Sequence, residues 1–205
     1  MIEIKQIINE PVSSNCFVAF DKSVGNFCIV IDPGSNNNSS LLSFLNSNDL
    51  IPQFIILTHE HFDHCWGVNS LRERYEDIKL ICSSECSKNI QSKKKNYSVF
   101  YEQPGFELVS ADIEIEENKC LEIMNKKVFF TLAKGHSASG IIFIIDNYLF
   151  TGDELIKDVK TVTKLKTGSK EQLKDSLLFI HTLQGKNLKV CPGHGETFDL
   201  DSYIF

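Results

Sequence analysis

Three histidines and an aspartate fall within six residues of one another, directly after a short apolar segment. The segment Phe54–Leu57 is predicted to be a buried strand, and it leads into Thr58-His59-Glu60-His61-Phe62-Asp63-His64. Neutral imidazoles and carboxylates are the ligands that zinc, iron and manganese accept in hydrolytic sites. Because so dense a cluster of these side chains serves no ordinary packing purpose, it predicts a metal site at the end of this strand.

Three further residues of the same types also follow predicted strands. They are His136 after Lys127–Ala133, Asp153 after Asn147–Phe150, and His194 after Leu188–Cys191. Each adjoins a glycine, which lets the backbone turn sharply, and a strand end holds a side chain rigidly at an open edge. Taken singly, a Gly-His pair is a turn and an aspartate is a helix cap. His181 is interpreted as a plain helix residue.

The remaining segments predict a mixture of strands and helices in irregular order. Further strands are predicted at Glu3–Ile8, Asn15–Phe20, Phe27–Ile31, Ile78–Cys82 and Ile141–Ile145, and helices at Ser39–Leu45, Cys65–Tyr75, Ser84–Ile90 and Ser169–Leu183. Residues 96–119 are acidic and irregular, apart from one alternating stretch at Asp112–Glu116. No repeat, linker or boundary interrupts the chain. This order predicts two β-sheets with helices packed outside them, in a single domain of residues 1–205.

Composition narrows the classes of partner. The chain has 42% hydrophobic and 23% charged residues, as in ordinary globular proteins, and we expect no membrane segment and no signal peptide, hence a cytoplasmic location. A net charge of −6 disfavours binding to nucleic acid and to anionic membranes. Separately, we expect the partner to be a small-molecule substrate. The seven cysteines are scattered and odd in number, so we interpret them as reduced and structural.

The cluster Thr58–His64 resembles the THxHxDH motif of the metallo-β-lactamase superfamily. The later landmarks follow in that family's order: Asp32 in a strand-end Asp-Pro-Gly, His136 in Gly-His-Ser, Asp153 in Phe-Thr-Gly-Asp, and His194 in Pro-Gly-His-Gly. The resemblance extends from about Asn15 to Gly195. It implies an α/β (α+β) fold, a four-layer αββα sandwich with the metals at one edge.

The resemblance also implies a set of metal ligands. His59, His61 and His136 are expected to hold a first metal, Asp63, His64 and His194 a second, and Asp153 to bridge the two. The implied cofactors are two divalent metal ions, zinc in the first place, with iron or manganese also compatible. Two such ions about 3.5–4 Å apart activate water near neutral pH. The implied catalytic set is His59, His61, Asp63 and His64, with Asp63 orienting that water.

Three departures from the family pattern stand out. The usual TPGHTPGS text appears here as Leu132–Gly140 without its prolines, and the arginine-bearing segment of glyoxalase II-like members is replaced by Lys157–Lys166. The chain also ends at Phe205, soon after His194, where glyoxalase II proteins continue into a helical domain.

The function that this resemblance favours is glyoxalase II-like hydrolysis of a small thioester or ester. Lactone hydrolysis and phosphodiester cleavage are alternatives on the same site, and a persulfide dioxygenase with a single iron is a redox alternative. A non-catalytic binding protein is the remaining one. A true β-lactamase is disfavoured, because Asp153 stands where those enzymes lack a bridging carboxylate and no export signal is found. The identity of the substrate, the metal and the oligomeric state are left open by the sequence.

Overall fold

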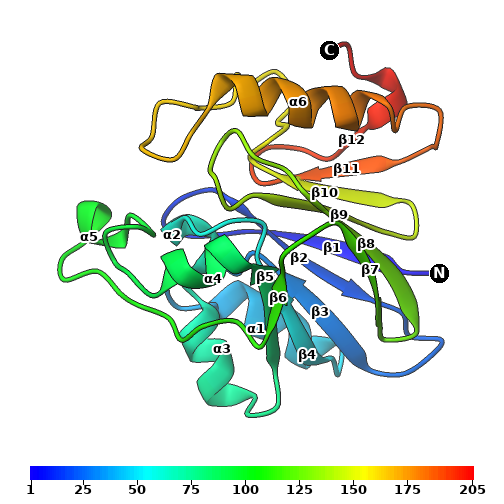
Figure 1. Cartoon of the computed structure of the whole chain (residues 1–205). Helices are drawn as coiled ribbons and strands as arrows, with labels where there is room; N and C mark the ends of the chain where they lie inside the picture. Colours follow the sequence, from blue (N-terminus) through cyan, green and yellow to red (C-terminus); the bar gives the residue numbers. More distant parts are fainter. The chain divides into compact units, whose positions relative to one another are not determined.

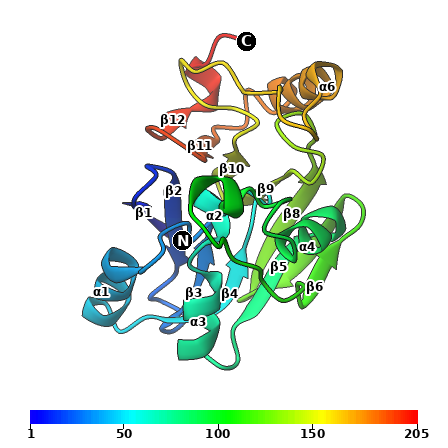
Figure 2. The ribbon, with the colours of Figure 1, turned by 90° about the vertical axis from the view of Figure 1, so that its left-hand side faces the viewer.

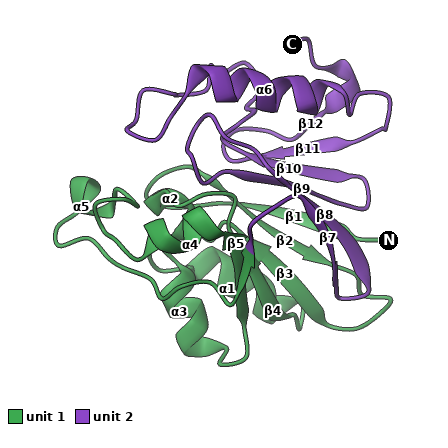
Figure 3. Cartoon of the chain, viewed as in Figure 1, with its two compact units in different colours: residues 1–114 green, residues 115–205 purple.

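The computed structural model describes residues 1–205, and the chain divides into two compact units, residues 1–114 and 115–205 (Figure 3). Each unit contains one six-stranded sheet with helices (Figure 1). None of the helices has the length and apolar character needed to cross a membrane. That all 205 residues form one domain stays a prediction.

Unit 1 is built on a mixed sheet in the order β1-β2-β3-β4-β5-β6. Its elements are β1 (Glu3–Ile8), β2 (Asn15–Phe20), β3 (Phe27–Ile31), α1 (Ser39–Ser47), β4 (Ile51–Ile56), α2 (Phe62–Cys65), α3 (Val68–Arg74), β5 (Lys79–Ser83), α4 (Ser84–Ile90), α5 (Ser98–Tyr101) and β6 (Ile113–Ile115). The first two pairings are antiparallel, whereas β3 pairs with β4 and β4 with β5 in parallel. Because parallel strands end at the same edge, the residues after β3 and β4 meet there.

Helices cover one face of this sheet (Figure 2). Leu45 of α1, Leu71 of α3 and Ile90 of α4 are fully buried and pack in one cluster with alternate strand residues such as Val30 and Ile55. The intervening strand residues are buried as well, which explains why the central strands are apolar in continuous runs instead of alternating. A rigid, doubly buried sheet thus supports the loops at its edge.

Unit 2 repeats this plan with the order β12-β11-β10-β9-β8-β7. Its elements are β7 (Lys119–Ile123), β8 (Lys126–Leu132), β9 (Ile141–Ile145), β10 (Tyr148–Gly152), α6 (Lys170–His181), β11 (Lys189–Pro192), β12 (Phe198–Asp199) and a 3-10 turn (Leu200–Ser202). Only β10 and β11 pair in parallel. Ser169 caps α6 as predicted, since its Oγ accepts a hydrogen bond of 3.3 Å from the Gln172 N–H.

The predicted helix Cys65–Tyr75 is wrong, because the chain forms α2 and α3 with a break between them. A continuous helix needs the Gly67 N–H to bond the Asp63 carbonyl four residues earlier. The Gly67 N–H instead donates to the Pro33 carbonyl at 2.7 Å, while the Asp63 carbonyl accepts a short hydrogen bond from the Ser14 hydroxyl. Tertiary partners therefore take both groups, and the helix breaks at Gly67.

Other differences lie in weakly patterned segments. Residues 96–119 contain the short helix α5. The strands β7 and β12 form in segments with little alternation of apolar and polar residues. The β7–β8 turn places Met124 and Asn125 at φ 52° and 59°, a left-handed pair usually signalled by Asn-Gly. The strand predicted at Phe54–Leu57 is β4, which begins earlier, at Ile51.

All seven cysteines are free and six are buried, as predicted.

Candidate metal centre

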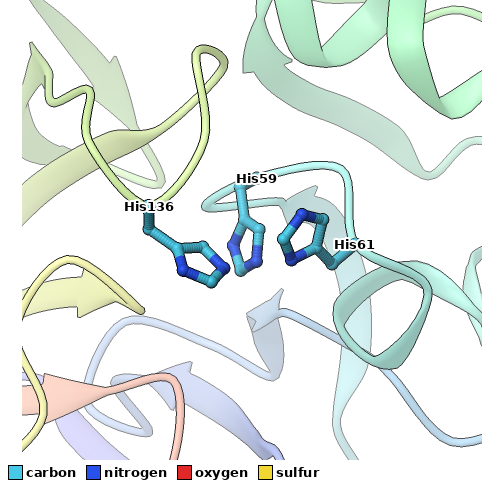
Figure 4. Close-up of side chains that lie close together, drawn as sticks. All are labelled: His59, His61 and His136. Atoms are coloured by element: carbon cyan, nitrogen blue, oxygen red, sulfur yellow. The ribbon is translucent and has the colours of Figure 1, made fainter. Parts of the chain in front are cut away.

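The segment Thr58–His64, which we call the histidine loop, follows β4 and includes the start of α2, and it brings three imidazoles into contact within unit 1. The His59 ring centroid lies 4.5 Å from that of His61 and 4.2 Å from that of His64. Figure 4 shows the His59 and His61 side chains next to each other. The side chains are nearly removed from solvent, with exposed fractions of 2%, 6% and 0% for His59, His61 and His64. Burying three polar rings together is unfavourable unless their nitrogens have partners, so each ring nitrogen needs a hydrogen bond or a bound metal.

Asp32, at the end of β3, organises this loop. Its carboxylate is buried and accepts hydrogen bonds from the Thr58 N–H at 2.8 Å and the Thr58 hydroxyl at 2.6 Å. The same Oδ2 atom lies 3.0 Å from Nδ1 of His64. Thr58 Oγ1 in turn lies 3.0 Å from Nδ1 of His59. One carboxylate therefore connects to two of the three imidazoles.

These contacts assign the protons on both rings. An ionised carboxylate only accepts, so Nδ1 of His64 carries the proton that is donated to Asp32. The Thr58 hydroxyl uses its single hydrogen on Asp32, so it accepts from Nδ1–H of His59. The neutral form of each ring then has its lone pair on Nε2, the atom that a metal would bind.

Asp63 belongs to the same loop and is 13% exposed at its side chain, with Oδ2 3.7 Å from Nε2 of His64. Its backbone is held tightly by the Asp32-Pro33-Gly34 turn and Ser14. A Cβ on Gly34 would lie 1.5 Å from the Asp63 carbonyl oxygen, so only glycine fits at this close approach. The Asp-Pro-Gly turn thus positions the loop twice, through the Asp32 carboxylate and through Gly34.

Unit 2 gathers His136, Asp153 and His194, each of which follows a strand. Oδ2 of Asp153 lies 3.5 Å from Nε2 of His136 and 3.7 Å from Nε2 of His194. Nδ1 of His136 lies 2.9 Å from the Val162 carbonyl, an acceptor that fixes the proton on Nδ1 and the lone pair on Nε2. The parallel pair β10 and β11 brings Asp153 and His194 to the same edge.

Glu154 supports the loop that carries His136. Its side chain is 3% exposed, and Oε1 accepts a 3.1 Å hydrogen bond from the His136 N–H. A Cβ on Gly140 would lie 2.9 Å from the same oxygen, so a glycine leaves room for it. Burial raises the pKa of Glu154 to about 8, although hydrogen bonds from the His136 and Ser137 backbone oppose this shift. A buried carboxyl thus orders a loop that lacks the family's prolines.

The donors in both units fit a divalent metal. Neutral imidazoles with a lone pair on Nε2 and carboxylates are ligands that zinc, iron and manganese accept, and no thiol lies among them. Candidate ligands are His59, His61, Asp63 and His64 in unit 1 and His136, Asp153 and His194 in unit 2. Their roles as ligands stay predictions.

Sequence reasoning found these residues but missed their supports. The sequence marks Asp32 as a landmark and a turn, and its bonds to Thr58 and His64 follow only from the pairing of β3 with β4. Glu154 offered no signal beyond its place after Asp153. His181 lies on α6 and takes no part in either cluster, as predicted.

Comparison with known proteins supports the family. The model of the metallo-beta-lactamase superfamily matches residues 9–194. A hydroxyacylglutathione hydrolase of Xanthomonas euvesicatoria is 29% identical over 170 residues, which cover 82% of this chain and 56% of that protein. One from Hamiltonella defensa is 27% identical, over 94% of this chain and 67% of its own. The chain therefore spans little more than half to two thirds of these relatives.

Among solved structures, the BLEG-1 B3 metallo-beta-lactamase resembles the chain with a TM-score of 0.89 and 25% identity. The likeness covers 97% of this chain and 94% of that one, and it confirms the fold that the sequence resemblance implies. The family model covers most of the chain, and the ordered landmarks Asp32, His59, His136, Asp153 and His194 lie within it. The chain therefore belongs to the metallo-beta-lactamase superfamily.

Proposed function

We propose that this protein is a metal-dependent hydrolase of small thioesters or esters that uses two divalent ions. The first ion would be held by His59, His61 and His136, the second by Asp63, His64 and His194, and Asp153 would bridge them. The proposal joins residues of both units on the strength of the family's ligand pattern. Zinc is the proposed metal, and iron or manganese suits the same donors.

The observation that carries the proposal is the hydrogen-bonding of the imidazoles. Asp32, Thr58 and the Val162 carbonyl each accept from, or connect to, an Nδ1 atom, and this leaves Nε2 of His59, His64 and His136 with a lone pair. A set of purely structural histidines has no reason to share one orientation. The shared orientation of these rings supports the proposal that they bind a cation.

The residues of the chain would divide the chemistry between them. When bound, a pair of divalent ions lowers the pKa of water towards neutrality and polarises a substrate carbonyl. Asp63 has a partly exposed carboxylate beside His64, so it can orient the attacking water and hold its proton. Asp153 keeps two imidazoles within 3.7 Å of one anionic oxygen. The buried Asp32 network fixes the orientation of the His59 and His64 rings.

The names of these relatives favour a thioester as the substrate. They are hydroxyacylglutathione hydrolases, matched over most of this chain but only 56% and 67% of their own lengths. The thioester is therefore proposed from the part that is shared. The structural likeness to a B3 metallo-beta-lactamase makes a β-lactam a necessary comparison substrate.

The first experiment measures metal content. The full chain is purified without added metal and analysed for metals beside His59→Ala and His181→Ala, the second being a matched histidine on α6 outside both clusters. We expect about two ions per chain in wild type and His181→Ala, and fewer in His59→Ala. A wild-type protein that takes up no metal after reconstitution would refute the proposal.

The second experiment measures hydrolysis by the same metal-loaded proteins. The panel contains a hydroxyacylglutathione thioester, an aryl ester, an acyl-homoserine lactone, bis-p-nitrophenyl phosphate and a β-lactam. We expect turnover of the thioester or ester by wild type and His181→Ala, and its loss in His59→Ala. Turnover confined to the lactone, phosphodiester or β-lactam would move the assignment there. A single iron with oxygen uptake on a persulfide would support the redox alternative instead.

A further inference from the structure

The segment after α4 places aromatic side chains beside the histidine loop of unit 1. The Tyr97 ring meets the His61 ring edge-on, with centroids 5.0 Å apart and planes at 85°. Phe100 lies 6.3 Å from Tyr97, and Tyr101 stacks on Phe62 at 4.7 Å and 27°. We call Tyr97, Phe100 and Tyr101 the aromatic rim. Tyr97 and Phe100 form a series of ring contacts that begins at His61, a candidate metal ligand, and Tyr101 contacts Phe62, the residue after His61.

The backbone of Tyr97 adopts an unfavourable conformation. Its φ is 65°, in the left-handed region that large side chains seldom occupy because Cβ crowds the carbonyl oxygen. Such conformations persist only where their surroundings hold them, and they concentrate at binding and catalytic sites. The φ of Tyr97 therefore costs free energy that contacts with its surroundings must offset.

Asn96 supplies the contacts that hold it. This side chain is fully buried, its Nδ2 donates to the Phe106 carbonyl at 2.9 Å, and its Oδ1 accepts from the Ser98 N–H at 2.9 Å. Its own carbonyl accepts from the Phe62 N–H at 2.8 Å. Because Phe62 directly follows His61, the loop is fastened to the histidine loop itself. The distance from Tyr97 to His61 is therefore set by the backbone.

The aromatic residues behind the rim pack against one another, whereas the outer surface of the rim is left exposed. Phe62, Trp66 and Phe106 are half-buried, and the Trp66 ring centroid lies 5.7 Å from those of both Phe62 and Phe106, so part of their apolar area is covered. Phe100, however, is 72% exposed and Tyr101 is 49% exposed. Apolar area left in water contributes nothing to folding, so the rim offers aromatic surface that the fold does not use.

We propose that the aromatic rim binds an aromatic acyl group of the substrate, next to the carbonyl that is cleaved. This inference rests on the proposed hydrolase function and names the substrate class of that site. The three rim side chains are neutral and present ring edges and faces, which suit offset or edge-on contact with another ring. They offer a small hydroxyacyl group little to contact. The preferred substrate is therefore an arylacyl thioester.

The test compares two thioesters of one thiol, one arylacyl and one hydroxyacyl, on metal-loaded full-length protein. For Phe100→Ala we expect the ratio of kcat/KM values, arylacyl over hydroxyacyl, to fall about tenfold, the size of one aromatic contact. Phe100→Tyr should restore the ratio. The matched control is Phe27→Ala, which removes a 43% exposed phenylalanine at the opposite end of β3 from Asp32 and should leave the ratio unchanged.

A binding measurement separates this proposal from the proposed function. Calorimetry with a non-cleavable arylacyl thioether analogue should show tighter binding to wild type than to Phe100→Ala, with no such difference for the hydroxyacyl analogue. If no thioester is hydrolysed yet this difference appears, the hydrolase proposal fails and the rim stands. If hydrolysis proceeds and the Phe100→Ala ratio equals that of wild type, the rim proposal is overturned.

Discussion

The buried carboxyl of Glu154 predicts a pH-dependent stability in the metal-free protein. Burial is the largest cause that raises its pKa from 4.5 to about 8, hydrogen bonds from the His136 and Ser137 N–H groups oppose it, and the Asp153 charge adds to it. In the unfolded chain the same carboxyl loses its proton near 4.5. Between these two values the folded state holds one proton more than the unfolded state.

The sign of the effect follows from this extra proton. Because the folded state binds more protons, the free energy of unfolding falls as pH rises through this window. Because each pH unit between a pKa of 4.5 and one of about 8 is worth about 1.36 kcal/mol, Glu154 contributes at most roughly 5 kcal/mol to the free energy of unfolding. The stabilisation is complete below the unfolded pKa and is lost as pH approaches about 8.

Glu154→Gln removes the titration while keeping the amide oxygen as an acceptor for the His136 N–H. Urea unfolding of wild type and variant, both with chelator, is measured from about pH 5 to about pH 8. We expect the variant to gain stability relative to wild type as pH rises, by as much as about 3.5 kcal/mol between these two pH values. Glu171→Gln is the control, since Glu171 is solvent-exposed in the first turn of α6 and its pKa is lowered. Parallel pH profiles for wild type and Glu154→Gln would refute the reasoning.

Three further outcomes are expected. Gly135→Ala places a Cβ 2.4 Å from the Leu173 Cα at φ 153°, so thermal unfolding should show a loss of stability of about 3 kcal/mol. The control Gly185→Ala, whose Cβ would have nothing within 4 Å, should lose less stability, and equal losses would contradict the packing argument. Asp32→Asn should weaken metal binding about 10–100-fold in competition with a chromophoric chelator, and unchanged affinity would remove its orienting role. In the folded protein, Cys120 alone should react with a thiol reagent, because it is the one exposed cysteine; fast reaction of several thiols would contradict the buried assignment.

Patterns local in sequence were sufficient to predict much of the fold. Continuous apolar runs such as Phe27–Ile31 and Ile141–Ile145 became β3 and β9 with the predicted bounds, because buried strands need only local hydrophobicity. Ser169 starts α6 as a capping residue does in any context. The break at Gly67 was beyond reach, since it depends on Ser14 and Pro33, far away along the chain.

The candidate site shows the same division. The sequence by itself determined which candidate metal ligands exist, because imidazoles and carboxylates at strand ends are recognised by residue type and spacing, as in His59, His61 and His64. Tertiary structure alone decided how they are oriented: Asp32 reaches Thr58 and His64 because β3 and β4 pair in parallel, and Tyr97 reaches His61 because Asn96 bonds Phe62. A proton's place on an imidazole is fixed by the partner of the other nitrogen, and that partner lies elsewhere in the chain.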